Sequence, residues 1–218
     1  MILKNFPLEK AILLIRHGES EHMTQGVRGG SPASPLTQTG RQQIGLLAQR
    51  LAGELGGIPS RLVCSRMQRA IESAEIISKG LDLSPETIPD LNELDTGKAS
   101  GKPKAKAQQM YTPPTDPLWD WRPYPGAENW REFHIRVAGT MDRLYPAQDN
   151  RLLIVTAHQG TIINILYWWT ELKAADLART RLSFHTDPAS LSLLVINEWQ
   201  ERTLCILNDT SHLASLEK

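Results

Sequence analysis

Residues 11–20, AILLIRHGES, place an arginine, a histidine and a glycine directly after five consecutive apolar residues. A short unbroken apolar run is typical of a central strand that is covered on both faces of a sheet. Ligands of open α/β sheets bind beyond the carboxyl ends of the strands, where Arg16 and His17 would lie. Gly18 would let the backbone turn sharply and approach a ligand. By itself the tripeptide is explained more simply by an arginine that caps the strand and pairs with Glu19, so the rest of the chain decides.

A second apolar strand, in residues 151–169 (RLLIVTAHQGTIINILYWW), also ends in a histidine, His158. Gln159 and Gly160 follow, and an apolar helix begins there. The N-terminus of a helix presents unpaired backbone N–H groups and the positive end of the helix dipole, which together favour an anion. The sequence therefore predicts an anion site beside His158.

A third basic group is expected at the same edge of the sheet. The strand over residues 61–65 leads directly into a helix, and Arg69 falls in the first turn of that helix. Ser65 and Gln68 have the spacing of a capping box, and Gly80 is expected to end the helix. The helix dipole disfavours a cation in the first turn, unless an anion lies close by. Arg69 is therefore a candidate for binding an anion.

The remaining chain alternates amphipathic helices with short apolar strands, which indicates an α/β protein with a mostly parallel sheet. The last two apolar runs, joined by NEWQER, are typical of antiparallel strands added at the edge of such a sheet. Beyond the two strands above, we expect helices over 37–55, 65–80 and 126–145, a smaller helix near 174–180, and strands over 61–65, 191–196 and 203–208.

Residues 87–97, TIPDLNELDTG, are expected to form a short strand and a turn, with Glu93 as the one candidate functional group. An isolated glutamate is more often a surface group. From Lys98 to Pro125 regular periodicity disappears, and prolines alternate with tyrosines and tryptophans. Two interpretations are equally good: a packed excursion that covers a pocket as a lid, or a loop that is fixed to the surface for stability.

Composition limits the class of protein. The chain has 218 residues with 24 acidic and 24 basic ones and no shift in composition, so we expect one domain over 1–218. This balance argues against binding to nucleic acid or to an anionic membrane. No apolar run reaches the roughly 20 residues of a membrane span, and MILKNFPLEK lacks the apolar region of a signal peptide. We therefore expect a cytoplasmic protein in which Cys64 and Cys205 are free thiols.

Taken in order, these stretches resemble the histidine phosphatase superfamily, also called the phosphoglycerate mutase-like family, over nearly the whole chain. Any one match is weak, but the ordered set is specific. The resemblance implies a three-layer αβα sandwich around the mostly parallel sheet. The matching motifs are Arg16-His17-Gly18 with Glu19-Ser20, Pro35-Leu36-Thr37 with Gly40, Arg69-Ala70 with Ser73-Ala74, Leu91 to Glu93, His158-Gln159-Gly160, and Asn208-Asp209 with His212-Leu213.

The resemblance also implies a mechanism. His17 would attack phosphorus as a neutral imidazole and form a phosphohistidine, which divides one difficult displacement into two easier ones. Arg16 and Arg69 would hold the phosphoryl oxygens, and His158, cationic beside the phosphate, would add a third donor. Glu93 would protonate the leaving alkoxide and later activate water. The basic groups already supply positive charge, so we expect neither a metal nor a cofactor.

Several positions depart from the family pattern and leave the substrate open. Met23 stands where an asparagine often contacts phosphate, and His22 or Gln25 could replace it. The usual Gly-x-Trp-Glu-Gly reads Gly-Lys-Ala-Ser-Gly at 97–101, and Gln159 replaces a glycine. In addition to Arg16, Arg69 and His158, four residues are candidates for binding the phosphate. They are His22, Gly29, Gly30 and Gln159.

Three functions compete. A phosphomonoester phosphatase is favoured because residues 124–128, YPGAE, resemble the Pro-Gly-Gly-Glu-Ser segment of the family's broad-specificity phosphatases. A phosphoglycerate mutase primed by 2,3-bisphosphoglycerate comes second, because the longer arginine-bearing insertion that mutases use is not found. A non-catalytic phospho-ligand binder comes third. The expected partner is a small phosphorylated metabolite, and a homodimer is left open.

Overall fold

The computed structural model describes residues 2–146, 148–172, 176 and 182–216, and its centre is a six-stranded sheet in the order β3-β2-β4-β1-β5-β6. The pairs β1–β4, β2–β4 and β2–β3 are parallel, and β1–β5 and β5–β6 are antiparallel. This confirms the mostly parallel sheet with an antiparallel edge. The strands are β1 (Ile12–Arg16), β2 (Ser60–Cys64), β3 (Glu86–Thr87), β4 (Leu152–Ala157), β5 (Leu191–Ile196) and β6 (Arg202–Asp209).

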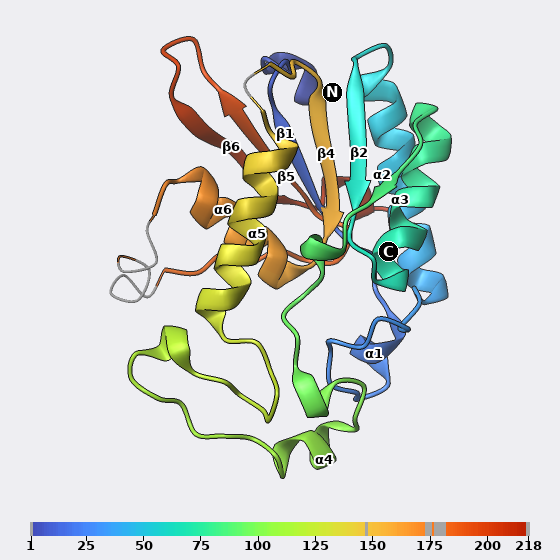
Figure 1. Ribbon diagram of the computed structural model, residues 1–218. Helices are drawn as coiled ribbons and strands as arrows, with labels where there is room; N and C mark the ends of the chain where they lie inside the picture. The colour runs from blue at the N-terminus through green and yellow to red at the C-terminus, as the bar shows by residue number, and fades with distance from the viewer. Residues whose placement is uncertain (1, 147, 173–175, 177–181, 217–218) are drawn as a thin grey trace.

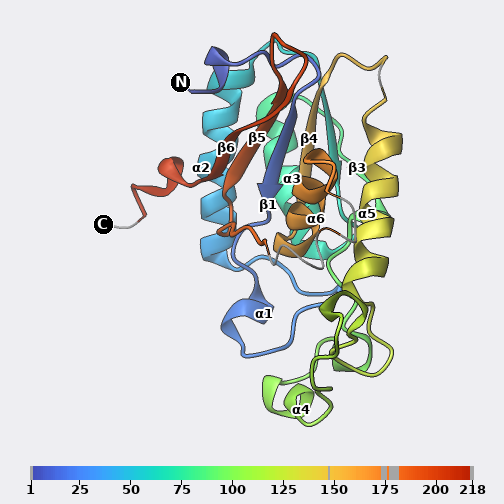
Figure 2. The same cartoon turned by 90° about the vertical axis from the view of Figure 1, so that its left-hand side faces the viewer.

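Helices cover both faces of the sheet, as Figure 2 shows in the view along its edge. Side chains alternate along β1, so that Leu13 and Ile15 pack in one buried cluster and Ile12 and Leu14 in another. The first cluster includes the apolar faces of α2 (Gln38–Leu55) and α3 (Gln68–Leu81). The second includes those of α5 (Trp130–Leu144) and α6 (Gln159–Trp169). The fold is therefore the expected three-layer αβα sandwich.

The predicted start of α2 is confirmed, because the Thr37 side chain accepts a hydrogen bond from the backbone N–H of Gly40. The predicted capping box of α3 is wrong. Met67 is the N-cap of that helix and makes no side-chain cap, while the Ser65 hydroxyl contacts a residue of another element, described below. The predicted end at Gly80 is also wrong, because the helix continues to Leu81.

The helix expected over 126–145 begins later than predicted, at Trp130. Asn129 caps it: its side chain accepts from the backbone N–H of Glu132, whose carboxylate accepts from the Asn129 N–H in return. This capping box fixes the start of α5 and leaves Gly126 in a turn, with φ +73°, and residues 127–129 outside the helix.

The irregular segment 98–125 projects beyond the carboxyl ends of the parallel strands, next to α1 (Glu21–Thr24) (Figure 1). It contains a short α-helix, α4 (Lys104–Gln108), and a 3-10 turn at Leu118–Asp120, neither of which periodicity revealed. Tyr124 is buried in a small cluster of its own, and Trp119 packs on Ile163 and Tyr167 of α6. The segment is therefore packed against the domain, which both interpretations allow, so its role as a lid stays a prediction.

Two further expectations concern helices. The smaller helix near 174–180 lies outside the described residues. Within residues 2–146, 148–172, 176 and 182–216, every helix is too short or too polar to cross a bilayer.

Candidate active site

The two strand-end histidines lie side by side because β1 and β4 are neighbours in the sheet. Arg16 pairs with Ala157 in the parallel register, and the backbone N–H of His17 donates to the Ala157 carbonyl at 3.0 Å. The ring centroids of His17 and His158 are 5.1 Å apart. Residues separated by more than 130 positions in the sequence thus meet at the carboxyl edge of the sheet.

The His17 ring is buried and held in one orientation. Its Nδ1 lies 2.7 Å from the Gly18 carbonyl oxygen, and Arg69 Nε donates to its Nε2 at 3.1 Å. Because a carbonyl can only accept, Nδ1 carries the proton and Nε2 presents its lone pair. Burial first, and then the charge of Arg69, hold the pKa of His17 well below its ordinary value, although the bond to Gly18 opposes this. The ring is therefore neutral at physiological pH.

Arg69 is only 1% exposed, yet its guanidinium has no carboxylate partner among the residues that the structure describes. Nη1 donates to the Ser31 carbonyl at 3.0 Å, and Nη2 lies 3.0 Å from Met67 Sδ. Burial lowers the pKa of Arg69 to about 10, with Glu93 opposing this and Arg16 adding to it. The group is still a cation at neutral pH, and a buried cation without a counter-ion favours an incoming anion.

Arg16 adds a second cation to the same place. Nη1 donates to the Thr186 carbonyl, and Nε is buried without a partner among the described residues. Burial lowers the pKa of Arg16, while Glu93 and Asp187 raise it. Its free donor and its position at the end of β1 suit the binding of a phosphoryl oxygen.

His158 is the N-cap of α6 and is 1% exposed. Its Nε2 lies 2.6 Å from Ser65 Oγ, a partner that sequence reasoning had assigned to a helix cap. Burial, followed by Arg69 and His17, holds the pKa of His158 well below its ordinary value. The expected cationic ring therefore depends on the negative charge of a bound phosphate, because the side chains around it favour the neutral form.

Glu93 is held at the N-terminus of α6. Its Oε2 accepts from the backbone N–H of Gly160 at 3.0 Å, and its Oε1 accepts from its neighbour Leu94 at 2.8 Å. A Cβ atom on residue 160 would lie 2.3 Å from Oε1. Gly160 thus leaves the room that the Glu93 carboxylate occupies, which sequence reasoning did not reveal although Gly160 directly follows the His158-Gln159 pair.

These groups surround a pocket of about 300 Å³. Every site residue predicted from the sequence lines it except His158, whose ring lies next to that of His17. His22 lines the pocket but Gln25 does not, and burial lowers the pKa of His22 to about 4. Sequence reasoning missed several lining residues. The predicted ones are Arg16, His17, His22, Gly29, Gly30, Arg69, Glu93 and Gln159, and those missed include Arg28, Thr96 and Trp130.

The loop that carries Gly29 and Gly30 is joined to the Glu93 segment. Thr96 Oγ1 donates to the Gly29 carbonyl at 2.8 Å. A Cβ atom on residue 30 would lie 2.3 Å from Thr96 Oγ1. Gly30 also has φ +101°, a conformation that strongly favours glycine. Gly30 therefore lets the loop pack closely over one wall of the pocket.

In the described part of the chain, no group of three or more His, Cys, Asp and Glu side chains is arranged to hold a metal ion. Cys64 and Cys205 are free thiols, as predicted.

Comparisons with known proteins agree on one family. A model of the histidine phosphatase superfamily (branch 1) matches residues 12–210. An uncharacterized phosphatase, PhoE, of Bacillus subtilis is 30% identical over 79% of this chain and 83% of its own length. An adenosylcobalamin/alpha-ribazole phosphatase of Salmonella typhimurium is 28% identical over 78% of this chain and 84% of its own. The crystal structure of the alpha-ribazole phosphatase from Shigella flexneri matches with TM-score 0.76 at 24% identity, covering 92% of this chain and 96% of that one, which establishes a common fold.

Proposed function

Because the chain belongs to the histidine phosphatase superfamily, we propose that it hydrolyses small phosphate monoesters through a phosphohistidine formed on His17. The observation that carries this proposal is the state of the His17 ring. The Nδ1–H donates to the Gly18 carbonyl, and the lone pair of Nε2 accepts from the buried guanidinium of Arg69. A neutral, oriented imidazole next to an unpaired cation is what attack on a phosphate ester requires.

As the ester binds, the Arg69 Nε–H, which donates to His17 Nε2 in the structure, turns to a phosphoryl oxygen and frees the lone pair of Nε2. In the first step, His17 Nε2 then bonds to phosphorus while the bond from phosphorus to the alcohol oxygen breaks. Arg16 and Arg69 donate to the non-bridging oxygens and offset their charge. Glu93 acts as the general acid and protonates the departing alkoxide. The products of the step are the free alcohol and a phosphohistidine whose Nδ1–H still donates to Gly18.

In the second step, water attacks the phosphohistidine. The Glu93 carboxylate takes a proton from the water as the oxygen bonds to phosphorus. The electron pair of the broken N–P bond returns to Nε2, which restores the neutral ring. Inorganic phosphate leaves and Glu93 is protonated again, so the cycle balances.

Several finer points belong to the same proposal. Arg16 and Arg69 already supply positive charge at the phosphoryl group, and this supports a metal-independent reaction. Full activity after treatment with a chelator is the expected result, and loss that a divalent ion restores would contradict it. The cytoplasmic location, the homodimer and the single-domain organisation stay predictions.

The test is the variant His17→Ala with p-nitrophenyl phosphate. We expect hydrolysis to fall by at least about 10³-fold and labelling of the enzyme by a phosphoryl donor to disappear. Turnover at the wild-type rate would remove the nucleophile assignment. Incubation with 3-phosphoglycerate, with and without 2,3-bisphosphoglycerate, separates the phosphatase from a mutase, because a mutase forms the isomer faster than it releases phosphate.

A further inference from the structure

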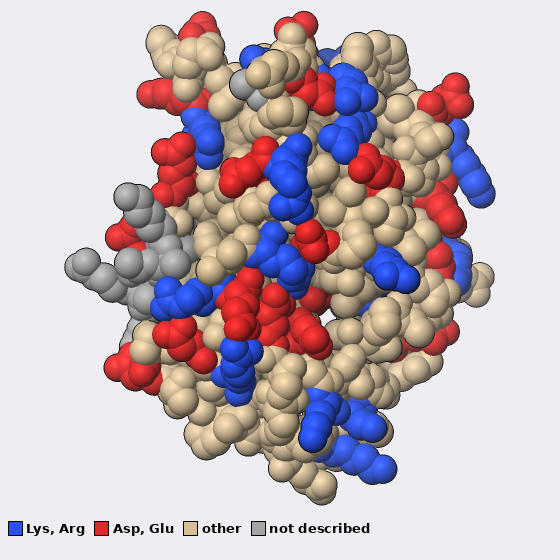
Figure 3. Space-filling view, in the orientation of Figure 1, with Lys and Arg blue, Asp and Glu red and all other residues tan. Residues whose placement is uncertain are grey.

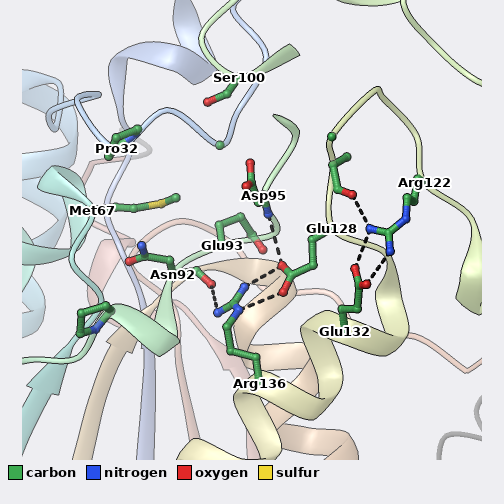
Figure 4. A pocket seen from close by; sticks show the side chains of 14 residues that line it. Pro32, Met67, Asn92, Glu93, Asp95, Ser100, Arg122, Glu128, Glu132 and Arg136 are labelled. Carbon is green, nitrogen blue, oxygen red and sulfur yellow. Dashed lines mark hydrogen bonds and ion pairs between the residues drawn. The ribbon is translucent and has the colours of Figure 1, made fainter. Parts of the chain in front are cut away.

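A second cavity, of about 650 Å³, adjoins the phosphate pocket and shares Gly30 and Glu93 with it (Figure 4). We call it the side cavity. We propose that the side cavity binds the leaving group of the substrate and selects alcohols that carry hydroxyl or amino groups and no second anion. This inference rests on the proposed function, since it concerns the alcohol that Glu93 protonates. The side cavity is lined by Gly30, Pro32, Met67, Pro89, Asn92, Glu93, Asp95, Ser100, Arg122, Gly126, Ala127, Glu128, Glu132 and Arg136.

The position of Glu93 determines where the leaving group of the substrate lies. The proton of Glu93 goes to the oxygen that joins phosphorus to the leaving group, so this oxygen must lie beside the carboxylate. With the phosphoryl group held by Arg16 and Arg69, the rest of the leaving group extends past Glu93 into the side cavity. The volume of this cavity lies in the range of pockets that enclose a whole small molecule, about 300–1,000 Å³.

The side cavity and the phosphate pocket differ in charge. The lining of the side cavity holds four carboxylates, Glu93, Asp95, Glu128 and Glu132, and two guanidinium groups, Arg122 and Arg136. Acidic side chains gather on this face near the N-terminal end of α5 (Figure 3). The phosphate pocket, by contrast, contains buried arginines without carboxylate partners. A ligand that spans both sites therefore meets positive charge at one end and negative charge at the other.

The two arginines of the side cavity are not available to a second anion. Arg136 donates from Nε at 3.0 Å and Nη2 at 2.7 Å to the two carboxylate oxygens of Glu128, and its Nη1 is taken by the carbonyls of Asp90 and Asn92. Arg122 donates to both carboxylate oxygens of Glu132 and to the Ala127 carbonyl. Both pairs are bidentate, so a carboxylate on the leaving group would have to displace Glu128 or Glu132 from its arginine.

Asp95 is the acceptor that remains for a ligand. Its Oδ1 accepts from the backbone N–H of Gly97 at 2.8 Å, whereas Oδ2 has no hydrogen bond within the described residues. Ser100 and Asn92 line the same cavity and add a hydroxyl and an amide. A free carboxylate oxygen accepts from a hydroxyl or ammonium group and repels a second anion. The side cavity thus favours neutral or cationic alcohols.

The experiment uses two substrates that differ at one group, glycerol 3-phosphate and 3-phosphoglycerate. The first carries a hydroxymethyl group where the second carries a carboxylate. Each is measured as a substrate, from its kcat/KM, and as a competitive inhibitor of p-nitrophenyl phosphate hydrolysis, so that poor turnover still yields an affinity. We expect wild type to favour glycerol 3-phosphate by about tenfold or more, as for one full charge several ångströms from another at intermediate dielectric.

Asp95→Lys should shift this preference toward 3-phosphoglycerate by about tenfold or more, and Asp95→Asn should shift it less. For each variant, the kcat/KM for each ester is divided by the kcat/KM of that variant for p-nitrophenyl phosphate. If Asp95→Lys does not fold, Asp95→Asn alone tests the inference. Asp142→Asn is the matched control, because Asp142 is exposed and lies almost three helical turns beyond Glu132 on α5. Its preference should equal that of wild type.

Equal preference for the two esters in wild type, or the same preference in Asp95→Lys as in wild type, would overturn the side-cavity inference and leave the phosphatase proposal standing. No hydrolysis of any ester and no phosphoenzyme would overturn the phosphatase proposal itself.

Discussion

Glu93 and Gly160 are linked by a hydrogen bond of 3.0 Å, and any side chain at position 160 would collide with the carboxylate that this bond holds. The bond comes from a backbone N–H in the first turn of α6, the helix that His158 caps. Position 160 therefore sets where the proposed acid/base group lies relative to the phosphate pocket. A glycine here gives the carboxylate room that no other residue would leave.

Gly160→Ala should displace the Glu93 carboxylate and slow hydrolysis of alkyl phosphates by about 10²-fold, the order that general acid catalysis contributes. The loss on p-nitrophenyl phosphate should be smaller, because its leaving group needs less protonation. Gly53→Ala is the control, since a Cβ atom there meets nothing within 4 Å and alanine suits the interior of α2. Equal rates for Gly160→Ala and wild type on alkyl phosphates would contradict the positioning role.

Ser65→Ala should lower kcat/KM by about tenfold while the protein remains folded. The substitution removes the 2.6 Å contact between Ser65 Oγ and His158 Nε2, so a buried ring nitrogen loses its partner. It also removes the hydrogen bond that Ser65 Oγ accepts from the Met67 backbone N–H at 3.2 Å. Steady-state kinetics and thermal denaturation measure the two effects. Ser78→Ala, which removes a hydroxyl bonded to the Glu75 carbonyl on the same α3, should leave kinetics unchanged. A kinetic loss of the same size in both variants would remove the special role of Ser65.

The stability of the protein should fall as pH falls below about 6.5. His17 and His158 stay neutral in the folded state because burial, followed by the charge of Arg69, lowers their pKa values, whereas both rings take up protons in the unfolded chain near pH 6.5. Each ring then lowers the free energy of unfolding by up to about 1.4 kcal/mol per pH unit until its folded pKa is reached. Urea denaturation at a series of pH values measures the slope.

His17→Gln should reduce the slope of the unfolding free energy against pH by the contribution of one histidine ring. His185→Gln is the control, because the His185 side chain is 68% exposed. A slope that is the same in wild type and His17→Gln would show that the His17 ring is already protonated in the folded protein or neutral in both states.

Trp119→Ala should change substrate preference more than it changes the rate on a small aryl phosphate. Trp119 attaches the segment 98–125 to α6 through Ile163 and Tyr167, and Ile163 also lines the phosphate pocket. Releasing this contact should alter the fit of bulky esters through the lid, whereas p-nitrophenyl phosphate depends mainly on the phosphate contacts. The ratio of kcat/KM values over a substrate panel is the measurement. Trp199→Ala, at a tryptophan that is 73% exposed, is the control, and unchanged preference in Trp119→Ala would reject the lid.

The central strands were predictable because their burial on both faces leaves unbroken apolar runs, as in residues 11–15 and 152–155. The polar residues after those runs were also predictable as a site, since strand ends meet at one edge. Periodicity did not show that β1 and β4 are neighbours, because that depends on the topology of the sheet. The starts of α3 and α5 were misplaced for different reasons.

For α3, the spacing of Ser65 and Gln68 predicted a local cap, but the hydroxyl contacts His158, which is 93 residues away and invisible to local patterns. For α5, the capping-box pair of Asn129 and Glu132 is written in the sequence, and the helix pattern was extended past it. The steric role of Gly160 could not be predicted from the sequence, because it depends on where the Glu93 carboxylate lies in the fold. Contacts between residues that are distant in the sequence determine the geometry of the site, and rules of local spacing cannot predict such contacts.

Glu93→Gln tests the proposed acid and base directly. The amide retains the size of the side chain and can still accept from Gly160, but it cannot give a proton to the leaving oxygen or take one from water. With alkyl phosphates, we expect the first step to slow by about 10²–10⁴-fold. With p-nitrophenyl phosphate the first step should slow less, so that phosphoenzyme accumulates because water is no longer activated in the second step. Rapid-quench measurement of phosphoenzyme against released p-nitrophenol separates the two steps, and Glu75→Gln, at an exposed glutamate of α3, serves as the control. Equal losses on both kinds of ester, without accumulation of phosphoenzyme, would show that Glu93 supports the pocket and moves no proton.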